Sequence, residues 1–266
     1  MFESFYEALS DVPGVKLLNR PQEVEPYCPD TGGAMRYPAG VLQVTDTSAV
    51  PRILAAANAH RVPLWPISGG RNFGYGTAQP VAAGSVVVDL SPLKRIEIDT
   101  EAAVARIEPG VTQHELERAI RRAGARLLVP TTGVGPNGNI LGNALDGGYG
   151  LTPITDHFDA VSAVSGHWGS GLPFHHSYQD LHCGDLAERW RVGTGPYWGG
   201  LLRQGNFGIV TQATVQLARE PEDCRILIFE WPSDERFEAS QGALAGIAED
   251  IPGIGGIIMM NDCRIL

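Results

Sequence analysis

Cysteine is scarce in this sequence, and its four cysteines stand far apart with no CxxC pair: Cys28, Cys183, Cys224 and Cys263. Disulfide frameworks and zinc sites use closely and regularly spaced cysteines, so this spacing argues against both. Reduced thiols in a cytoplasmic protein fit the pattern better.

Two kinds of apolar segment are also missing. The first residues, MFESFYEALSDVPG, have no cationic start followed by an apolar core, so we expect no secretory signal. No apolar run approaches the length of a membrane span, so we expect no membrane partner. Both observations favour the cytoplasm.

Positive charge is in deficit, because the formal net charge is −10. A nucleic-acid binder needs a basic surface, so we expect no nucleic-acid partner. The acidic residues are spread along the chain and serve solubility, which leaves small-molecule chemistry as the expectation. A chain of 266 residues can form one large domain or two modest ones.

Helices and strands do not alternate strictly along the chain. Residues 48–60 place four apolar side chains on one helix face, with Ser48 as a cap and Pro51 in the first turn: Val50, Ile53, Leu54 and Ala57. Thr112 and Glu115 form a capping box that opens a second helix. Strands are predicted at 62–67, 85–90, 102–110 and 208–218. This order indicates an α+β fold rather than a doubly wound sheet.

Glycine is concentrated in the segment PISGGRNFGYGTAQP, residues 66–80. It is neither the Rossmann G-x-G-x-x-G nor a Walker A loop, since no Gly-Lys-Ser/Thr occurs. Taken alone, it is either an anion-binding loop or a turn. A second segment, 128–150, lacks a regular pattern, and its apolar residues argue for a packed loop: Ile140, Leu141, Ala144 and Leu145.

Four segments, in order, carry a family resemblance: PLWPISGGRNFGYG, EPGVTQHELERAI, GNILGNALDGGYGLTPITDHF and GPYWGGLLRQGNFGIVTQATVQL. They resemble the FAD-binding domain of the vanillyl-alcohol oxidase / p-cresol methylhydroxylase (PCMH) flavoproteins. The resemblance implies two α+β subdomains over residues 1–220, divided near 95, that enclose an extended FAD. It also implies a separate cap over the flavin.

The resemblance assigns cofactor-binding roles to three segments. Residues 67–74 would wrap the FAD pyrophosphate with backbone amides. The second glycine segment, GNALDGGYG at residues 142–150, would line the opposite wall, and residues 208–210 would run past the adenine. The implied cofactor-binding residues are Pro66, Ile67, Ser68, Gly69, Gly70, Arg71, Asn72, Phe73, Gly74, Pro130, Gly142, Asn143, Gly147, Gly150, His157, Gly208, Ile209 and Val210. His157 either approaches the flavin or braces the second segment, and bracing is favoured. The alternative is that these glycines only make turns.

Tyr75 matches a tyrosine that helps hold a substrate phenolate in the family's oxidases, and is the candidate catalytic residue; packing against the loop is the alternative. Several features depart from the family. Asn72 and Phe73 stand where some members of the broader superfamily link FAD to histidine, so FAD should be non-covalent. The acidic residue expected beside the flavin is absent from TTGVGPN.

The segment FHHSYQDLHCGD crowds His175, His176, His182, Cys183 and Asp185 together, but the spacing fits no metal motif. We expect a polar loop and no metal. Residues 221–266 resemble roughly the first β-α-β unit of the cap, with strands at 225–231 and 255–260 around a helix at 235–249. Three explanations stay open: a fragment of a longer protein, a homodimer through 221–266, or a naturally reduced relative, the last two being favoured together.

The resemblance implies an FAD-dependent oxidoreductase that passes a hydride from a small aromatic or secondary-metabolite substrate to flavin N5. The missing acid and the short cap leave a second possibility, a redox-dead relative that uses the flavin cleft for non-redox work such as cyclisation. A partner-binding subunit is the third.

Overall fold

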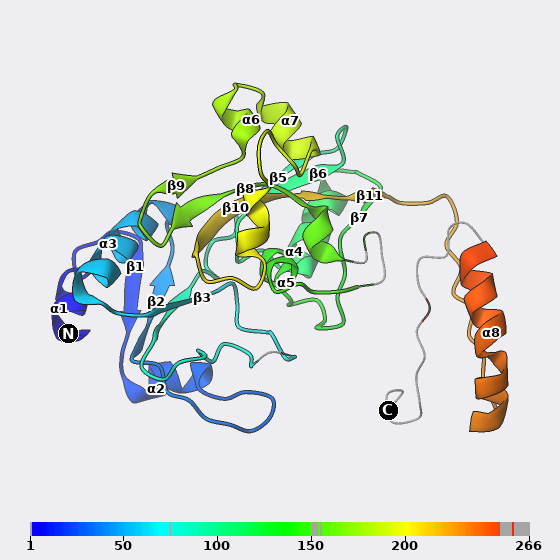
Figure 1. The fold of residues 1–266 in the computed structure, drawn as a ribbon, viewed down its shortest axis with the longest axis horizontal. Helices are drawn as coiled ribbons and strands as arrows, with labels where there is room; N and C mark the ends of the chain where they lie inside the picture. The colour runs from blue at the N-terminus through cyan, green and yellow to red at the C-terminus, as the bar shows by residue number, and fades with distance from the viewer. Residues whose placement is uncertain (1, 75, 151–153, 155, 251–256, 258–266) are drawn as a thin grey trace.

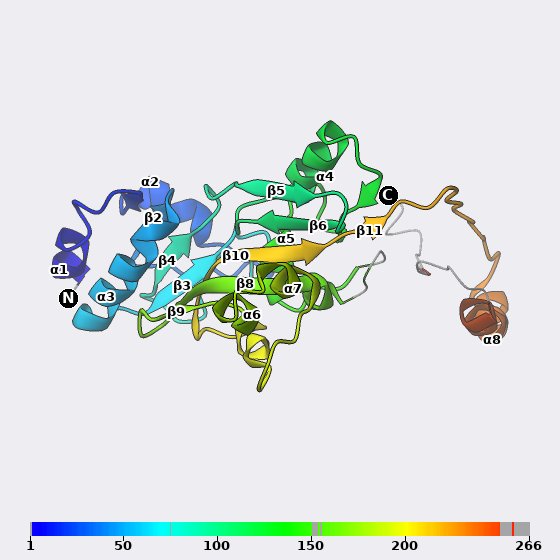
Figure 2. The same cartoon turned by 90° about the horizontal axis from the view of Figure 1, so that it is seen from above.

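The computed structural model describes residues 2–74, 76–150, 154, 156–250 and 257. Most of these residues form two sheets with helices packed on them, and the chain then runs out to an isolated helix, α8 (Asp234–Asp250). In both Figure 1 and Figure 2, α8 stands apart from the body of the molecule, at the end opposite α1 (Phe2–Glu7). No helix of the described part is long and apolar enough to cross a membrane.

The first sheet has the strand order β1-β2-β4-β3. Its strands are β1 (Val15–Leu18), β2 (Gly40–Val44), β3 (Leu64–Ile67) and β4 (Val86–Asp89). The strand β4 pairs in parallel with both β2 and β3, while β1 pairs antiparallel with β2. The side chains of β4 are buried on both faces of the sheet, because Val86 and Val88 pack with α3 (Val50–His60) and Val87 packs on the side of α2 (Pro21–Val24). This explains the uninterrupted valine run in the sequence.

The second sheet is antiparallel, with the order β5-β6-β10-β8-β9. Its strands are β5 (Ile96–Asp99), β6 (Val104–Ile107), β8 (Val161–Trp168), β9 (Pro173–Phe174) and β10 (Gly208–Gln216). The helices α4 (Gln113–Arg122) and α5 (Ile140–Leu145) bury Leu116, Ile120 and Leu141 in its core. A small ladder joins β7 (Leu127–Leu128) to β11 (Ala218–Arg219).

Short helical turns connect these elements. The α-helical turns α6 (Ser177–Asp180) and α7 (Gly184–Arg189) lie between β9 and β10 in the chain. The 3-10 turns are η1 (Glu25–Tyr27), η2 (Thr47–Ala49), η3 (His157–Ala160) and η4 (Trp198–Leu202).

One strand belongs to both cores. Ile209 of β10 is packed in the core of the first sheet, whereas its neighbour Val210 is packed in the core of the second. Successive side chains of a strand point to opposite faces, so the start of β10 contributes one side chain to each half of the molecule.

The α+β class expected from the sequence is confirmed, as are the helix expected at 48–60, the helix that the capping box at Thr112 opens, and the four predicted strands. The capping box at Thr112 and Glu115 forms, with the Thr112 N–H donating to Glu115 Oε2 at 2.9 Å. The prediction that Ser48 is the N-cap of the first of these helices is wrong. Asp46 accepts from the Ser48 N–H instead, and it starts a 3-10 turn that leads into α3.

Two further expectations need correction. Residues 140–145 were expected in a packed loop and form α5, which buries Ile140, Leu141 and Ala144. The strand expected at 225–231 does not form, because no described strand lies beside it to complete a ladder, and Ile226 is 85% exposed. The expected helix 235–249 is present as α8, while the strand expected at 255–260 falls outside the described residues except for position 257.

Candidate functional site

A cleft of about 400 Å³ opens between the end of β3, α5 and the start of β10. Pockets for small molecules and cofactors are typically some 300–1,000 Å³. Eleven of the predicted cofactor-binding residues line this cleft: Pro66, Ile67, Ser68, Gly69, Gly70, Arg71, Asn72, Gly142, Asn143, Gly208 and Val210. The fold therefore brings the first glycine segment, the second glycine segment and the start of β10 to one place.

The other predicted residues lie away from the cleft wall. Phe73 is 48% exposed and uses its carbonyl to accept from Thr31 Oγ1 at 2.7 Å. Ile209 is buried in the core of the first sheet. The remaining ones do not line the cleft, namely Gly74, Pro130, Gly147, Gly150 and His157. Tyr75, the candidate catalytic residue, lies outside the described residues.

The first glycine segment, residues 66–74, contributes its residues 66–72 to the wall of the cleft. Within the described part of the chain, the N–H groups of Gly69, Gly70 and Arg71 have no hydrogen-bond acceptor, although all three residues line the cleft. Gly70 has a φ of +66°, and a Cβ added there would lie 2.5 Å from Ala78 Cβ. Successive amides around a left-handed residue form an anion-binding concavity, so this segment is built to receive negative charge.

The helix α5 packs tightly against that segment. A Cβ added to Gly142 would lie 2.8 Å from Ser68 Oγ, so glycine is what allows the two walls to approach. Asn139, which precedes α5, donates from Nδ2 to the carbonyl of Gly110 at 2.8 Å. Asn72 Nδ2 donates to Asp146 Oδ2 at 2.6 Å and joins the two glycine segments directly.

His157 supports the second glycine segment from behind. Its Nδ1 lies 2.5 Å from Asn143 Oδ1, and Asn143 does line the cleft. Burial lowers the pKa of His157, with the opposing charge of Asp156 acting in the other direction, so the ring is neutral at neutral pH. With the proton on Nδ1, the buried Nε2 has no partner among the described residues. This geometry matches the bracing role.

Only two ionisable side chains are found among the described residues that line the cleft, Arg71 and Asp146. Burial raises the pKa of Asp146, and the hydrogen bond from Asn72 acts in the opposite direction. The sequence reasoning did not single out Asp146, Gln204 or Asn139, although all three line the cleft. The signal was present, because each lies inside or beside a glycine-rich motif that was already recognised.

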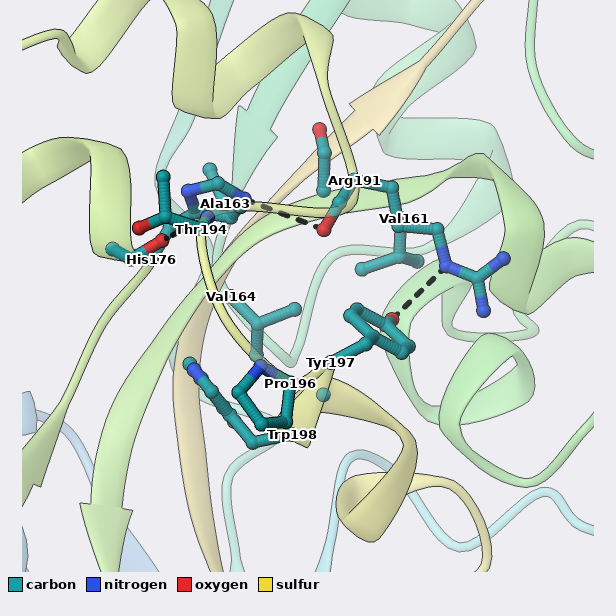
Figure 3. A pocket seen from close by; sticks show the side chains of 13 residues that line it. Val161, Ala163, Val164, His176, Arg191, Thr194, Pro196, Tyr197 and Trp198 are labelled. Carbon is teal, nitrogen blue, oxygen red and sulfur yellow. Dashed lines mark hydrogen bonds between the residues drawn. The ribbon is translucent and has the colours of Figure 1, made fainter.

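The histidine-rich segment is engaged in local structure. His176 Nδ1 accepts from the Tyr178 N–H and caps α6, and His175 Nε2 lies 2.5 Å from Asp180 Oδ1. The described residues contain no group of three or more potential metal ligands. Figure 3 shows a second pocket beside His176, with Arg191 donating to the Tyr197 hydroxyl. At about 20 Å³ it has room for little more than a water molecule.

Comparison with known proteins gives this cleft a context. The profile of a family described as "FAD binding domain" matches residues 38–166, which include the first glycine segment and α5. The chain is 32% identical over 205 residues to 1'-carboxy-chondrochloren decarboxylase of Chondromyces crocatus, covering 77% of this chain and 38% of the relative. It is 30% identical over 189 residues to the 4-cresol dehydrogenase [hydroxylating] flavoprotein subunit of Pseudomonas putida, covering 71% and 36%.

A solved structure agrees with these sequence matches. That of p-cresol methylhydroxylase with substrate bound superposes with a TM-score of 0.79 at 26% identity, covering 92% of this chain and 48% of that one. The chain thus spans less than half the length of the proteins to which it is similar.

The residues present fit FAD on their own chemistry. The cleft offers backbone amides that have no acceptor among the described residues and the Arg71 guanidinium for a pyrophosphate, and glycines where a cofactor must approach the backbone. Together with the profile match and the superposition, this fit identifies the chain as a member of the flavoprotein family whose FAD-binding domain is of the p-cresol methylhydroxylase type.

Proposed function

We propose that this chain holds FAD non-covalently in the cleft between its two glycine segments and serves as the flavin-binding part of an oxidoreductase. The observation that carries the proposal is that the N–H groups of Gly69, Gly70 and Arg71 have no hydrogen-bond acceptor among the described residues, in a segment that lines the cleft together with the second glycine segment. The substrate class proposed is a small aromatic or secondary metabolite, and it is supported by the relative named 4-cresol dehydrogenase.

Each wall of the cleft has a distinct task in this proposal. The amides of Gly69 to Arg71 bind the pyrophosphate, Gly142 and Asn143 form the facing wall, and Gly208 and Val210 pass the adenine. When bound, FAD supplies the acceptor for a hydride that leaves a substrate carbon. The protein contributes binding, orientation and the exclusion of water around that transfer.

The side chains that line the cleft support non-covalent binding. Histidine and tyrosine are the residues that link flavins in related proteins, and neither type occurs among the described residues that line the cleft. Tyr75 is proposed to stabilise the oxygen of a phenolic substrate as an anion. A Tyr75→Phe variant should therefore bind FAD like the parent chain and lose turnover of phenolic substrates when these are supplied.

An absorbance spectrum of the purified chain tests the cofactor proposal, recorded with and without added FAD and again after acid precipitation. A flavin band that stays in the supernatant after precipitation supports non-covalent FAD. A band that stays in the pellet contradicts the non-covalent part alone. A folded chain that takes up no added FAD contradicts the whole proposal.

A second reaction class is favoured by one specific observation, the relative named as a decarboxylase. The same domain would then support a reaction other than simple hydride removal, including non-redox work in the cleft. Anaerobic mixing with candidate substrates separates the two classes. Bleaching of the flavin without release of carbon dioxide supports the oxidoreductase, and release of carbon dioxide from an aromatic acid supports the decarboxylase.

Self-association and location complete the proposal. Residues 226–229 expose four large apolar side chains in a row, which supports a homodimer formed through residues 221–266: Ile226, Leu227, Ile228 and Phe229. The wide spacing of the cysteines supports a cytoplasmic location, where thiols stay reduced. Sedimentation of the purified chain at several concentrations measures the association state.

A further inference from the structure

Residues 28–36 form a small hairpin that belongs to neither sheet. An antiparallel bridge pairs Pro29 with Met35, and the Arg36 N–H donates to the carbonyl of Cys28 at 3.0 Å. In Figure 1 the hairpin comes soon after α2 and runs alongside the loop that follows β3. It precedes residues 38–166, the part of the chain that matches the family profile, so the profile does not describe it.

The hairpin holds the loop formed by residues 73–80, which continues the first glycine segment. Three side chains bond to carbonyl oxygens between the hairpin and this loop: Thr31 Oγ1 with Phe73 at 2.7 Å, Arg36 Nη1 with Pro80 at 2.7 Å, and Thr77 Oγ1 with Pro29 at 2.5 Å. Apart from the closure of the loop on Asn72, every hydrogen bond that joins residues 73–80 to another part of the described chain ends in the hairpin. The path of this loop is therefore set by residues 28–36.

Gln79 joins the loop to both sides of the hairpin. Its side chain is buried, with 5% of the residue exposed, and its Nε2 donates to the carbonyl of Cys28 at 2.6 Å and to that of Ala34 at 3.1 Å. A buried amide without hydrogen-bond partners is unfavourable, so these two contacts favour one arrangement of the loop against the hairpin.

Ala78 carries this arrangement to the cleft. It directly precedes Gln79, and a Cβ added to Gly70 would lie 2.5 Å from Ala78 Cβ, so the backbone of Gly70 packs closely on Ala78. The N–H groups of Gly69, Gly70 and Arg71 have no acceptor among the described residues, and all three residues line the cleft. The surface that supports these amides is thus fixed by the hairpin.

We propose that the hairpin 28–36 positions the first glycine segment for the pyrophosphate of FAD, and that Gln79 is the positioning residue through which it acts. This inference rests on the proposed function. Gln79 does not line the cleft, so its effect on the cofactor passes through Ala78 and Gly70. Donors that are already fixed in place bind a ligand more tightly, because their ordering does not oppose binding.

The experiment is an FAD titration of the full chain, followed by flavin fluorescence, with urea unfolding of the same samples. Gln79→Met keeps the length of the side chain and removes the amide, so it should weaken FAD binding about tenfold. Tyr6→Phe is the matched control, because it removes a side-chain hydrogen bond to the carbonyl of Ala39 at 2.9 Å in the same half of the molecule and away from the cleft. Both variants should lower the urea midpoint, and Tyr6→Phe should bind FAD like the parent.

A second pair of variants tests the hairpin at an exposed position. Thr31→Val removes the hydroxyl that donates to Phe73, so it should weaken FAD binding roughly two- to tenfold while the urea midpoint stays the same. Thr31→Ser keeps the hydroxyl and should bind FAD like the parent. This pair also decides the matter if Gln79→Met fails to fold.

The outcomes separate this inference from the proposed function. A Gln79→Met variant that binds FAD as tightly as the parent, or Thr31→Val and Thr31→Ser variants that bind it equally well, overturns the inference and leaves the proposed function standing. Equal losses of FAD affinity in Gln79→Met and Tyr6→Phe also overturn it, because affinity would then follow stability alone. A folded parent chain that binds no FAD overturns both.

Discussion

Replacing Gly70 by alanine should damage the chain in two separable ways. Gly70 has a φ of +66°, and an L-residue held in this left-handed region costs about 1–2 kcal/mol. The new Cβ would also lie 2.5 Å from Ala78 Cβ and 3.1 Å from Ala78 Cα, and overpacking of this kind costs about 1–3 kcal/mol. The free energy of unfolding should therefore fall by about 2–5 kcal/mol in total.

Gly124 provides a matched control because its φ is +67° and no atom lies within 4 Å of the position where a Cβ would be added. Gly124→Ala should lose only the backbone part, about 1–2 kcal/mol, with FAD affinity unchanged. Gly70→Ala should also weaken FAD binding by about tenfold or more, because a loss of about 1.4 kcal/mol in binding free energy already corresponds to a tenfold change in affinity. Urea unfolding and FAD titration measure the two effects.

A double variant tests the reasoning directly. Ala78→Gly removes the atom that the new Cβ would meet, so Gly70→Ala combined with Ala78→Gly should recover the overpacking part and leave the backbone part. Equal losses of stability in Gly70→Ala and Gly124→Ala, or a double variant no better than Gly70→Ala, would refute the close approach of Gly70 to Ala78.

Three shorter predictions follow from other contacts. Thr112→Ala should lower the free energy of unfolding by about 1 kcal/mol through loss of the capping box with Glu115, while FAD affinity, measured by titration, stays the same. Burial lowers the pKa of His157, so the unfolded chain takes up a proton that the folded chain does not, and the free energy of unfolding should fall as pH drops below 6.5. The urea midpoints at about pH 7.5 and 5.5 should therefore differ less in His157→Gln than in the parent chain, and an unchanged difference would count against this assignment. Replacing Ile226 and Ile228 together by aspartate should abolish self-association in sedimentation if the exposed segment forms a homodimer, whereas dimers of unchanged strength would place the contact elsewhere.

The elements predicted well are those whose local pattern already contains the reason for their structure. The helix α3 shows one apolar face at helical spacing, and β4 is a run of valines that only a strand buried on both sides would carry. The strand β8 was missed because its alanine, serine and glycine residues lack the β-branched signal; its burial comes from the strands beside it. Conversely, residues 225–231 have the strand pattern, and no strand in the described part of the chain lies beside them.

The candidate site also has parts that a local sequence pattern predicts and parts that depend on residues far away in the sequence. Glycine-rich motifs identified the segments that form the cleft, since glycine marks where backbone must approach closely. The contact between Asn72 and Asp146 joins residues 74 positions apart, and nothing in either local sequence names the other as its partner. Such contacts become visible only after the two segments have been folded together.

The sharing of β10 between the two cores has a consequence for how this chain is made. The first sheet and its helices come early in the sequence, yet their core contains Ile209, which a ribosome adds only after nearly all of both sheets has been synthesised. The packing of the N-terminal half is therefore complete only after it contacts a residue far away in the sequence. Contacts of this kind form slowly and leave apolar surface exposed until they have formed. Completion of both cores by one strand also means that the cleft takes its final shape in the same step, so the site for the cofactor and the finished fold should emerge together.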